Sequence, residues 1–321
     1  MNRRPLLLAS LATPFLAMPA LAWPERSVRI VIPYPPGGAA DTTARLIAEP
    51  MGRALGQSVV IDNRPGANGG IAAEHAAQSA PDGYTLLMGN LGPNAINPVI
   101  KSNLRYDPIR SFTPIVLANK VPLALMVRAD HPARDLARLL AMARESPGSI
   151  GYGSAGNGSA SHLAGEMLKT SAGINLLHVP YRGDAPGIVD LLSGTLPVML
   201  TTTVSALPQM RGGRVRILAV ASGARLSAMP DVPTFVEQGV AGYEVSSWNG
   251  LFGPANLPRP IVERVNAEAT RALRLPEVTQ RLEALGAQPA MGTPEDFSAF
   301  LRAELARWAE VVRTSGATAE D

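Results

Sequence analysis

The chain has 321 residues, of which 46% are hydrophobic and 17% charged, and its formal net charge is +3. This length allows about two domains with a substantial core, and the absence of cysteine excludes a disulfide scaffold, thiol catalysis and Cys-ligated metal. The small charge, without basic runs or aromatic-basic stripes, argues against a nucleic-acid partner.

The first residues are typical of a secretory signal peptide. A short basic head precedes an apolar segment, 6–22, that ends in the small-residue pattern Ala20-Leu21-Ala22. A membrane anchor is disfavoured because the segment is short, contains two prolines and ends at a cleavage pattern, and no later stretch is long enough to span a membrane. We therefore expect a signal peptide over 1–22, cleavage after Ala22, by the Sec or the twin-arginine route, and a monomer free in the periplasm.

Strand and helix patterns alternate from Val28 onward, which predicts an α/β fold with mixed sheets. Strands are expected over 28–32, 59–62, 85–88, 123–127, 149–152, 176–179, 196–200 and 215–220. Helices are expected over 41–55, 70–79, 132–144, 159–171, 185–192, 258–273, 276–285 and 294–314. Asp41 is expected to cap the first helix, Pro50 should kink or split it, and 89–98 is predicted to be a loop.

The alternation of strands and helices restarts near Pro122, which predicts a second domain. We expect lobe 1 over 23–122, lobe 2 over 123–243, and a mainly helical return to lobe 1 over 244–321. Two segments would then cross between the lobes. Domain interfaces of this kind are common places for ligand pockets, so a pocket is expected there.

The corner VRIVIPYPPGGAAD, Val28 to Asp41, is the first candidate site. Gly37 and Gly38 remove side chains where a ligand could approach the backbone, and the prolines fix the turn and remove competing N–H donors. The N–H groups of 39–42 would then point out of a helix start, which suits a carboxylate or a phosphate. An ordinary turn with Asp41 as helix cap explains the stretch equally well.

Two further glycine-rich loops precede helices. The loop Asn63–Gly70 is interpreted as a surface loop with glycines at positive φ. The loop 151–162 contains the spacing GxGxxG, but no acidic residue ends a following strand at the distance that a dinucleotide site needs. Tyr152 breaks the G-x-S-x-G hydrolase motif around Ser154. The simpler interpretation is a second anion cradle, formed by the Ser154 and Ser159 hydroxyls and backbone N–H groups.

The remaining candidate residues give weaker signals. None of the four histidines pairs with another at metal-ligand spacing: His75, His131, His162 and His178. We expect no metal and no cofactor, and we interpret His162 as structural. Trp248 is either a core aromatic or a pocket wall, and the small polar residues around it favour the wall.

Taken together, these loops resemble the Bug family, the periplasmic solute receptors of tripartite tricarboxylate transporters. The resemblance is carried, in the family's order, by YPPGGAAD, DNRPGANG, PDGYTLLMG, YGSAGNGSASHLAGEML, HVPYRGDAPGIVDLL, ILAVAS, MPDVPTFVEQG and WNGLFGPANLP. It covers nearly all of 23–321. It implies a type II periplasmic-binding-protein clamshell, or Venus flytrap, that closes on a small carboxylate and has membrane transporter subunits as partners.

The resemblance also implies a binding site shared by both lobes. The corner Tyr34–Asp41 would hold one carboxylate through backbone N–H groups and bridging waters, and Ser154–Ser159 would contact it from lobe 2. Such receptors often lack an arginine clamp. The expected ligand-binding residues are Tyr34, Gly38, Ala39, Ala40, Asp41, Asn90, Ser154, Gly156, Asn157, Ser159, Thr201, Thr202 and Trp248.

Two positions depart from the family pattern. Family members often carry an acidic residue where this chain has Thr201–Thr203, and a small or hydroxyl-bearing residue where it has Asp184. Both positions would border the distal end of the pocket. The uncharged threonines favour a second carboxylate or a polar ring substituent on the ligand over an ammonium group.

The leading hypothesis is a receptor, not an enzyme, that binds a di- or tricarboxylate, an acidic amino acid or an aromatic acid and delivers it to a transporter. A sensor that activates a membrane two-component kinase would use the same fold, and the sequence does not separate the two. A periplasmic hydrolase using Ser154 or Ser159 would need a base within hydrogen-bond reach, and His162 is the one nearby candidate.

Overall fold

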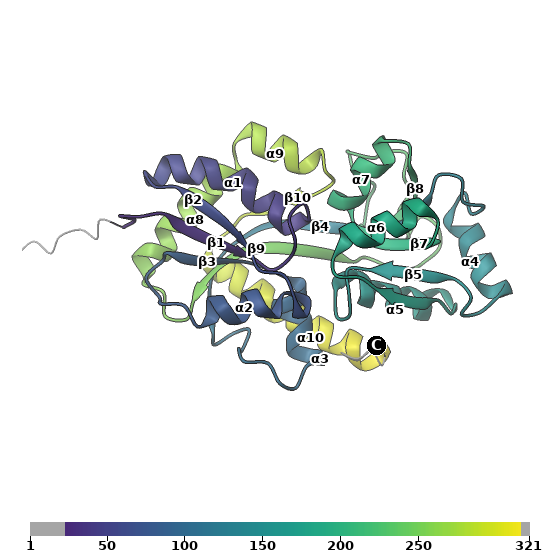
Figure 1. Ribbon diagram of the computed structural model, residues 1–321, viewed down its shortest axis with the longest axis horizontal. Helices are drawn as coiled ribbons and strands as arrows, with labels where there is room; N and C mark the ends of the chain where they lie inside the picture. Colours follow the sequence, from purple (N-terminus) through teal and green to yellow (C-terminus); the bar gives the residue numbers. More distant parts are fainter. Residues whose placement is uncertain (1–22, 316–321) are drawn as a thin grey trace, which may run out of the picture.

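The computed structural model describes residues 23–315 and shows two α/β lobes side by side (Figure 1). The expected signal peptide lies outside the described residues. In the left half of Figure 1 the first strands and helices are β1 (Val28–Ile32), α1 (Ala39–Leu55), β2 (Val59–Asn63), η1 (Ala67–Gly69), α2 (Gly70–Ala77), β3 (Thr85–Asn90), η2 (Gly92–Ile96) and α3 (Asn97–Ile100). The chain returns to this lobe with α8 (Arg259–Leu273), α9 (Pro276–Glu283), β10 (Gln288–Pro289) and α10 (Pro294–Ser315).

The right half of Figure 1 contains the second set of layers. Its elements are α4 (Leu136–Glu145), β5 (Gly151–Ser154), α5 (Ala160–Ala172), β6 (Leu177–Pro180), α6 (Asp184–Ser193), β7 (Val198–Thr202), α7 (Thr203–Arg211) and β8 (Val215–Val220). The strand order is β2-β1-β3-β9-β4-β7-β5-β6, with β8 and β10 pairing with β4. Both lobes mix parallel and antiparallel pairs, as the alternating pattern predicts.

Two long strands join the lobes, β4 (Phe112–Arg128) and β9 (Ser246–Pro254). Up to Pro122, β4 pairs with β9, and from Leu123 onward it pairs with β7 and β8. The Leu123 N–H donates to the Val245 carbonyl at 3.0 Å, so both crossings lie next to each other. The predicted strand 123–127 is therefore only the second half of a 17-residue strand. On this change of pairing we propose that the lobes divide at 122/123 and again near 244.

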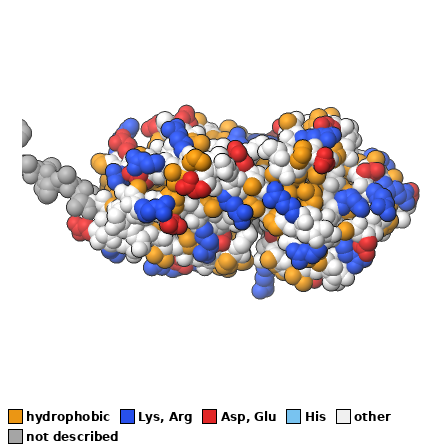
Figure 2. All heavy atoms as spheres, turned by 90° about the horizontal axis from the view of Figure 1, so that it is seen from above, with side chains coloured by type: hydrophobic (Ala, Val, Ile, Leu, Met, Phe, Trp, Pro, Cys, Tyr) orange, Lys and Arg blue, Asp and Glu red, His pale blue; other side chains and the backbone are white. Residues whose placement is uncertain are grey.

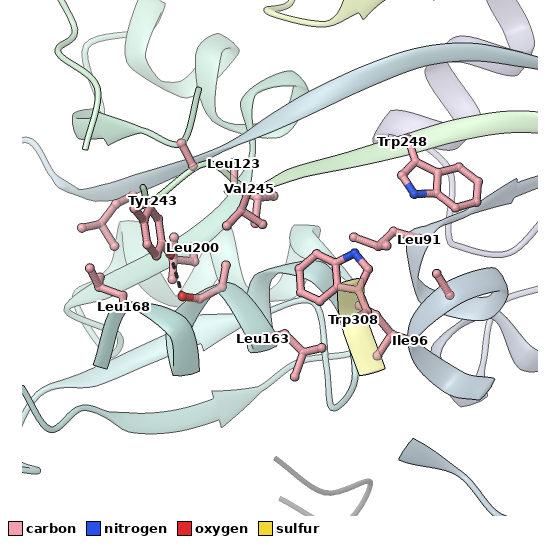
Figure 3. Packing of buried hydrophobic residues seen from close by; sticks show 14 of the residues in the cluster. Leu91, Ile96, Leu123, Leu163, Leu168, Leu200, Tyr243, Val245, Trp248 and Trp308 are labelled. Atoms are coloured by element: carbon pink, nitrogen blue, oxygen red, sulfur yellow. Dashed lines mark hydrogen bonds between the residues drawn. The ribbon is translucent and has the colours of Figure 1, made fainter. Parts of the chain in front are cut away.

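A hydrophobic cluster also connects the lobes, below the sheets as drawn in Figure 1. Trp308 of α10 is fully buried and lies between Ile96 of lobe 1 and Leu163 of lobe 2 (Figure 3). Tyr243 packs in the same cluster, and its hydroxyl donates to the Ala164 carbonyl at 2.6 Å. The cluster occupies one side of the paired strands β4 and β9 where they pass between the lobes, so a ligand can bind on the other side.

Several local predictions were wrong. Gly38, with φ −78° and ψ 176°, is the N-cap of α1, and Asp41 lies inside the first turn. Pro50 does not split α1, which is continuous from residue 39 to 55. The segment 89–98 is the end of β3 followed by η2 and the start of α3, not a loop. Helix α7 and strands β9 and β10 were not predicted, because prolines and glycines interrupt their patterns.

No helix within residues 23–315 combines the length and the hydropathy that a membrane span requires.

Candidate ligand-binding site

A cavity of about 440 Å³ lies where the two lobes meet, beside the β4–β9 crossing. This volume lies within the range of small-molecule sites. Figure 2 shows hydrophobic and basic side chains together at the junction of the two halves. The lining comes from both lobes and includes Tyr34, Pro35, Pro36, Gly37, Gly38, Ala39, Ala40, Asn90, Ala155, Ser159, Ala160, Ser161, Arg182, Asp184, Thr202, Ser205, Ser247 and Asn249.

The corner before α1 exposes its backbone to this cavity. A Cβ on Gly37, which has φ +89°, would have no atom within 4 Å, and one on Gly38 would have only the Pro35 carbonyl at 3.9 Å. The first helical hydrogen bond runs from the Thr42 N–H to the Gly38 carbonyl at 2.9 Å. Within the described residues, the N–H groups of Ala39 and Ala40 have no hydrogen-bond partner. They are the orphan donors of a helix start.

Asp41, one of the expected ligand-binding residues, does not line the cavity. It is 3% exposed, and its carboxylate accepts hydrogen bonds from the Gly37 N–H at 2.9 Å, Arg45 Nε at 2.9 Å and Asn63 Nδ2 at 3.0 Å. Burial alone would raise the pKa of Asp41, but these hydrogen bonds outweigh it and hold the pKa below its usual value. The ionised carboxylate therefore fixes the shape of the corner.

A second helix start faces the cavity from lobe 2. Ser159 is the N-cap of α5, and its hydroxyl accepts a hydrogen bond from the His162 N–H at 3.2 Å. The Ala155 N–H donates to Ser161 Oγ at 3.0 Å, which holds the loop against the helix. Ala160 and Ser161 line the cavity, and their N–H groups donate no hydrogen bond within the described part of the chain. The cavity thus has orphan backbone donors on both sides.

Ser154, Gly156 and Asn157 were predicted to contact the ligand, but none of them lines the cavity. Ser154 is fully buried, accepts the Gly156 N–H at 3.1 Å, and places its Oγ 2.7 Å from His178 Nε2. A Cβ on Gly156, at φ +122°, would lie 2.7 Å from the Tyr181 carbonyl. These residues support the loop before α5 without lining the cavity. The base beside Ser154 is His178 and not His162, and a serine buried away from the cavity has no access to a substrate.

Trp248 does not line this cavity, but it borders a separate one of about 240 Å³ together with Phe300 and Glu304. Its ring packs edge-on against Phe297 and Phe300, and its Nε1 donates to Glu304 Oε2 at 3.0 Å. Since side chains alternate along a strand, its neighbours Ser247 and Asn249 point the other way and line the cavity.

The same alternation separates the two threonines at the end of β7. Thr202 lines the cavity, whereas Thr201 is fully buried and does not, so only one of the two expected threonines faces the cavity. The small polar residues around Trp248 and the threonine run were correct signals of a nearby pocket. This alternation predicts which side chains line a cavity only when the bounds of the strand, and the face that it turns toward the cavity, are known.

The loop Asn63–Gly70, predicted to be a surface loop, links the corner before α1 to the loop before α5. Asn63 Nδ2 donates to the Tyr34 carbonyl at 3.0 Å, and the Tyr34 hydroxyl donates to Asn68 Oδ1 at 2.9 Å. Asn68 Nδ2 in turn donates to the Gly158 carbonyl of lobe 2. Burial raises the pKa of Tyr34, so its hydroxyl stays a donor. Sequence reasoning missed this role, because an asparagine in a loop does not reveal its partner.

A buried polar chain connects the cavity floor to α1. Asn249 Nδ2 donates to Asn119 Oδ1 at 2.8 Å, and Asn119 Nδ2 donates to Thr43 Oγ1 at 2.7 Å. The Thr43 hydroxyl donates to the Ala39 carbonyl at 2.7 Å. Asn90, which also lines the cavity, accepts the Gly92 N–H at 3.1 Å. Such networks help to hold a site rigid before a ligand arrives, although Asn249 Oδ1 has no hydrogen-bond partner among the described residues.

The cavity lining also contains charged residues, of which only Asp184 was expected from the sequence, at the distal end of the pocket. Asp184 begins α6 and accepts a hydrogen bond from Ser205 Oγ at 2.7 Å, and burial raises its pKa. Arg182 and Arg214 line the same cavity with exposed side chains. No group of three or more His, Asp or Glu side chains within residues 23–315 is arranged to hold a metal ion.

Two lobes joined by two adjacent strands, around a cavity with helix starts on both sides, define a solute-binding receptor of the periplasmic-binding-protein class. The sequence profile described as tripartite tricarboxylate transporter family receptor matches residues 43–317. The chain belongs to this family.

Individual relatives agree with this assignment. A UPF0065 protein from the tcbD-tcbE intergenic region of Pseudomonas sp. (strain P51) is 40% identical over 292 residues, which cover 91% of this chain and 87% of that protein. The structure of R. palustris Rpa4515 with adipate is 37% identical with a TM-score of 0.89, covering 92% of this chain and 99% of that one. The periplasmic binding protein BugD is 35% identical with a TM-score of 0.87, at coverages of 92% and 99%. The resemblance to the Bug family and the clamshell fold are confirmed, and the protein is a binding receptor, not an enzyme.

Proposed function

We propose that this protein is a periplasmic receptor that captures a small organic carboxylate between its lobes and delivers it to the membrane subunits of a tripartite tricarboxylate transporter. One observation carries the proposal. The starts of α1 and α5, from different lobes, present N–H groups without partners to the same cavity. The adipate bound by Rpa4515 supports a carboxylate ligand.

The physical argument rests on the backbone. A helix start carries partial positive charge and unpaired donors, and α1 and α5 are long enough, at 17 and 13 residues, for this effect to be fully developed. An anion that contacts both helix starts binds the closed arrangement of lobes better than an open one, so it favours closure. Bridging waters can extend the donors toward ligands of different size.

A ligand screen tests the binding part of the proposal. Thermal unfolding and calorimetry would compare succinate, adipate, citrate, glutamate and benzoate with glucose. A carboxylate at about 100 times its Kd should stabilise the fold by roughly 2.7 kcal/mol. Binding of glucose with no response to any carboxylate would overturn the proposal.

Proline substitutions test the helix starts directly. Ala39 and Ala160 are the first residues of their helices, and each follows a residue in extended conformation, Gly38 and Ser159. Proline is well tolerated at such a position, where it removes only the N–H donor. We expect Ala39→Pro and Ala160→Pro to fold and to weaken carboxylate binding about tenfold or more. Ala39→Gly and Ala160→Gly, which retain the N–H, are the matched controls.

Delivery and location need experiments in cells. Deletion of the gene should abolish uptake of the carboxylate found in the screen, and the wild-type gene should restore it. Unchanged uptake, together with a lost transcriptional response to that carboxylate, would instead favour the sensor. Mass spectrometry of the periplasmic fraction should show a chain that starts at Trp23.

A further inference from the structure

Asp184 is the single acidic side chain among the described residues that line the cavity. The loop before α5 holds it in place. The residue before it, Gly183, has φ +105°, and its N–H donates to the Ala155 carbonyl at 3.1 Å. A Cβ on Gly183 would lie 3.6 Å from Pro35 of the opposite lobe, so Asp184 begins its helix close to the contact between the lobes. A carboxylate at this place must meet any ligand that bridges the lobes.

Asp184 has hydroxyl groups but no basic group as partners within the described residues: burial raises its pKa by more than the Ser205 and Thr201 hydroxyls lower it. Ser205 Oγ donates one hydrogen bond to Asp184 at 2.7 Å, and Thr202 Oγ1 donates to Ser205 at 3.2 Å. A carboxylate offers about four acceptor positions. Among the described residues no ion pair joins Asp184 to a basic group, although Arg182 and Arg214 line the same cavity. Since burying an unpaired charge is costly, a donor on the ligand would stabilise it.

Apart from these polar groups and Gln209, the lining on the side of Asp184 is apolar. The following turns of α6 contribute Ile188, Val189 and Leu192 to the lining, and α7 contributes Pro208. Val189, which is 64% exposed, adds aliphatic surface to this part of the lining. A ligand that lies along these residues therefore has an apolar chain or ring.

We propose that Asp184 selects ligands that carry a hydrogen-bond donor, an amine or a hydroxyl, on the apolar body that bears the carboxylate. This inference rests on the proposed function, in which the helix starts hold the carboxylate. An amine or hydroxyl at Asp184 completes its hydrogen bonds, whereas a second carboxylate there is held only if one of the two carboxyl groups takes up a proton. The threonine run had favoured a second carboxylate or a polar ring substituent over an ammonium group, but Thr202 donates to Ser205 and Ser205 donates to Asp184.

Length-matched ligands test this selection. For straight chains of three to six carbons, calorimetry at neutral pH would compare the ω-amino acid, the ω-hydroxy acid, the plain fatty acid and the dicarboxylate. The variety of lengths removes any dependence on one assumed span. At the best length, the amino or hydroxy acid should bind about ten- to a hundredfold more tightly than the dicarboxylate.

Two variants and a control complete the test. Asp184→Asn should reverse the preference, so that the dicarboxylate binds as well as or better than the amino acid, and Asp184→Ser provides a second variant if the first does not fold. Asp190→Asn, on the same helix but outside the cavity lining, should leave every affinity within about twofold.

The outcomes separate the inference from the function. Dicarboxylates bound most tightly by the wild type would overturn the inference, and so would a preference that Asp184→Asn does not change, while the proposed function would stand. If no carboxylate of any kind binds, the proposed function itself fails.

Discussion

The corner before α1 and the loop before α5 have the same local pattern, a strand, several glycines and a helix start, but their glycines serve different purposes. At Gly38 an added Cβ would face open space, with one atom at 3.9 Å. At Gly156 it would lie 2.7 Å from the Tyr181 carbonyl. Glycine in the first corner leaves room at the cavity, and in the second it lets two chain segments pack. A glycine-rich corner thus predicts a turn, but not what approaches it.

Substitution of Gly156 and of Gly38 by alanine should test this contrast with the largest expected effects. Gly156→Ala combines a positive φ with a clash against backbone, and it should lower the free energy of unfolding by about 2–4 kcal/mol. Gly38→Ala, at φ −78°, should change it by less than about 0.5 kcal/mol but reduce carboxylate affinity, because the methyl group enters the cavity. Chemical denaturation and calorimetry check both. Equal losses of stability would contradict the contrast.

Removal of the Asp41 carboxylate should have the next largest effect. Asp41→Asn should lower the free energy of unfolding by about 1–2 kcal/mol at neutral pH, because the hydrogen bonds from Gly37 and Arg45 lose their charge assistance.

The effect of Asp41→Asn should depend on pH. The folded pKa of Asp41 lies below that of the unfolded chain, about 3.9, so its stabilisation is complete above that value. It is lost as the pH falls through the folded pKa, and the difference between wild type and variant should then vanish. Melting temperatures across the acid range measure this, with the exposed Asp231→Asn as control. A difference that grows toward acid pH would exclude the role assigned to Asp41.

Substitutions of two serines, Ser154 and Ser159, should distinguish a residue that supports the loop before α5 from one that contacts the ligand. Ser154→Ala removes the acceptor of the Gly156 N–H and should lower stability by about 1 kcal/mol, with affinity within twofold of wild type. Ser159→Gly should lower stability by only a few tenths of a kcal/mol and weaken binding several-fold, because Ser159 lines the cavity. Calorimetry that showed the reverse pattern would place Ser154, not Ser159, against the ligand.

Loss of the hydrogen bond from Asn68 to the Gly158 carbonyl, which connects the two lobes, should have the smallest effect. Asn68→Gly keeps the positive φ of 50° without strain but removes, besides the bonds of Asn68 with Tyr34 and Asn97, the hydrogen bond to the Gly158 carbonyl. Because this bond joins the lobes, carboxylate affinity should fall about threefold, with the lobes farther apart in solution scattering without ligand. Asn103→Gly, an exposed position, is the control. Identical scattering and affinity in both variants would remove Asn68 from the closure of the lobes.

Much of the fold could be predicted because its signals are local. Hydrophobic periodicity located β1, α5, β8 and α8 within a few residues, and proline at a helix start located α9 and α10. The failures have a common cause. Strand β4 passes through both lobes, and η2 forms where asparagine and proline suggested a loop, because long-range pairing and burial overrode local preference.

The sequence by itself determined the corner at Tyr34–Ala40, the helix start at Ser159 and the family to which the chain belongs. These depend on short motifs whose residues are neighbours along the chain. Only the tertiary structure decided that Ser247 and Asn249, rather than Trp248, line the cavity, and that Asp41 does not. The reason is that the facing of a strand and the meeting of two lobes arise from contacts between residues far apart in sequence, which no local pattern encodes.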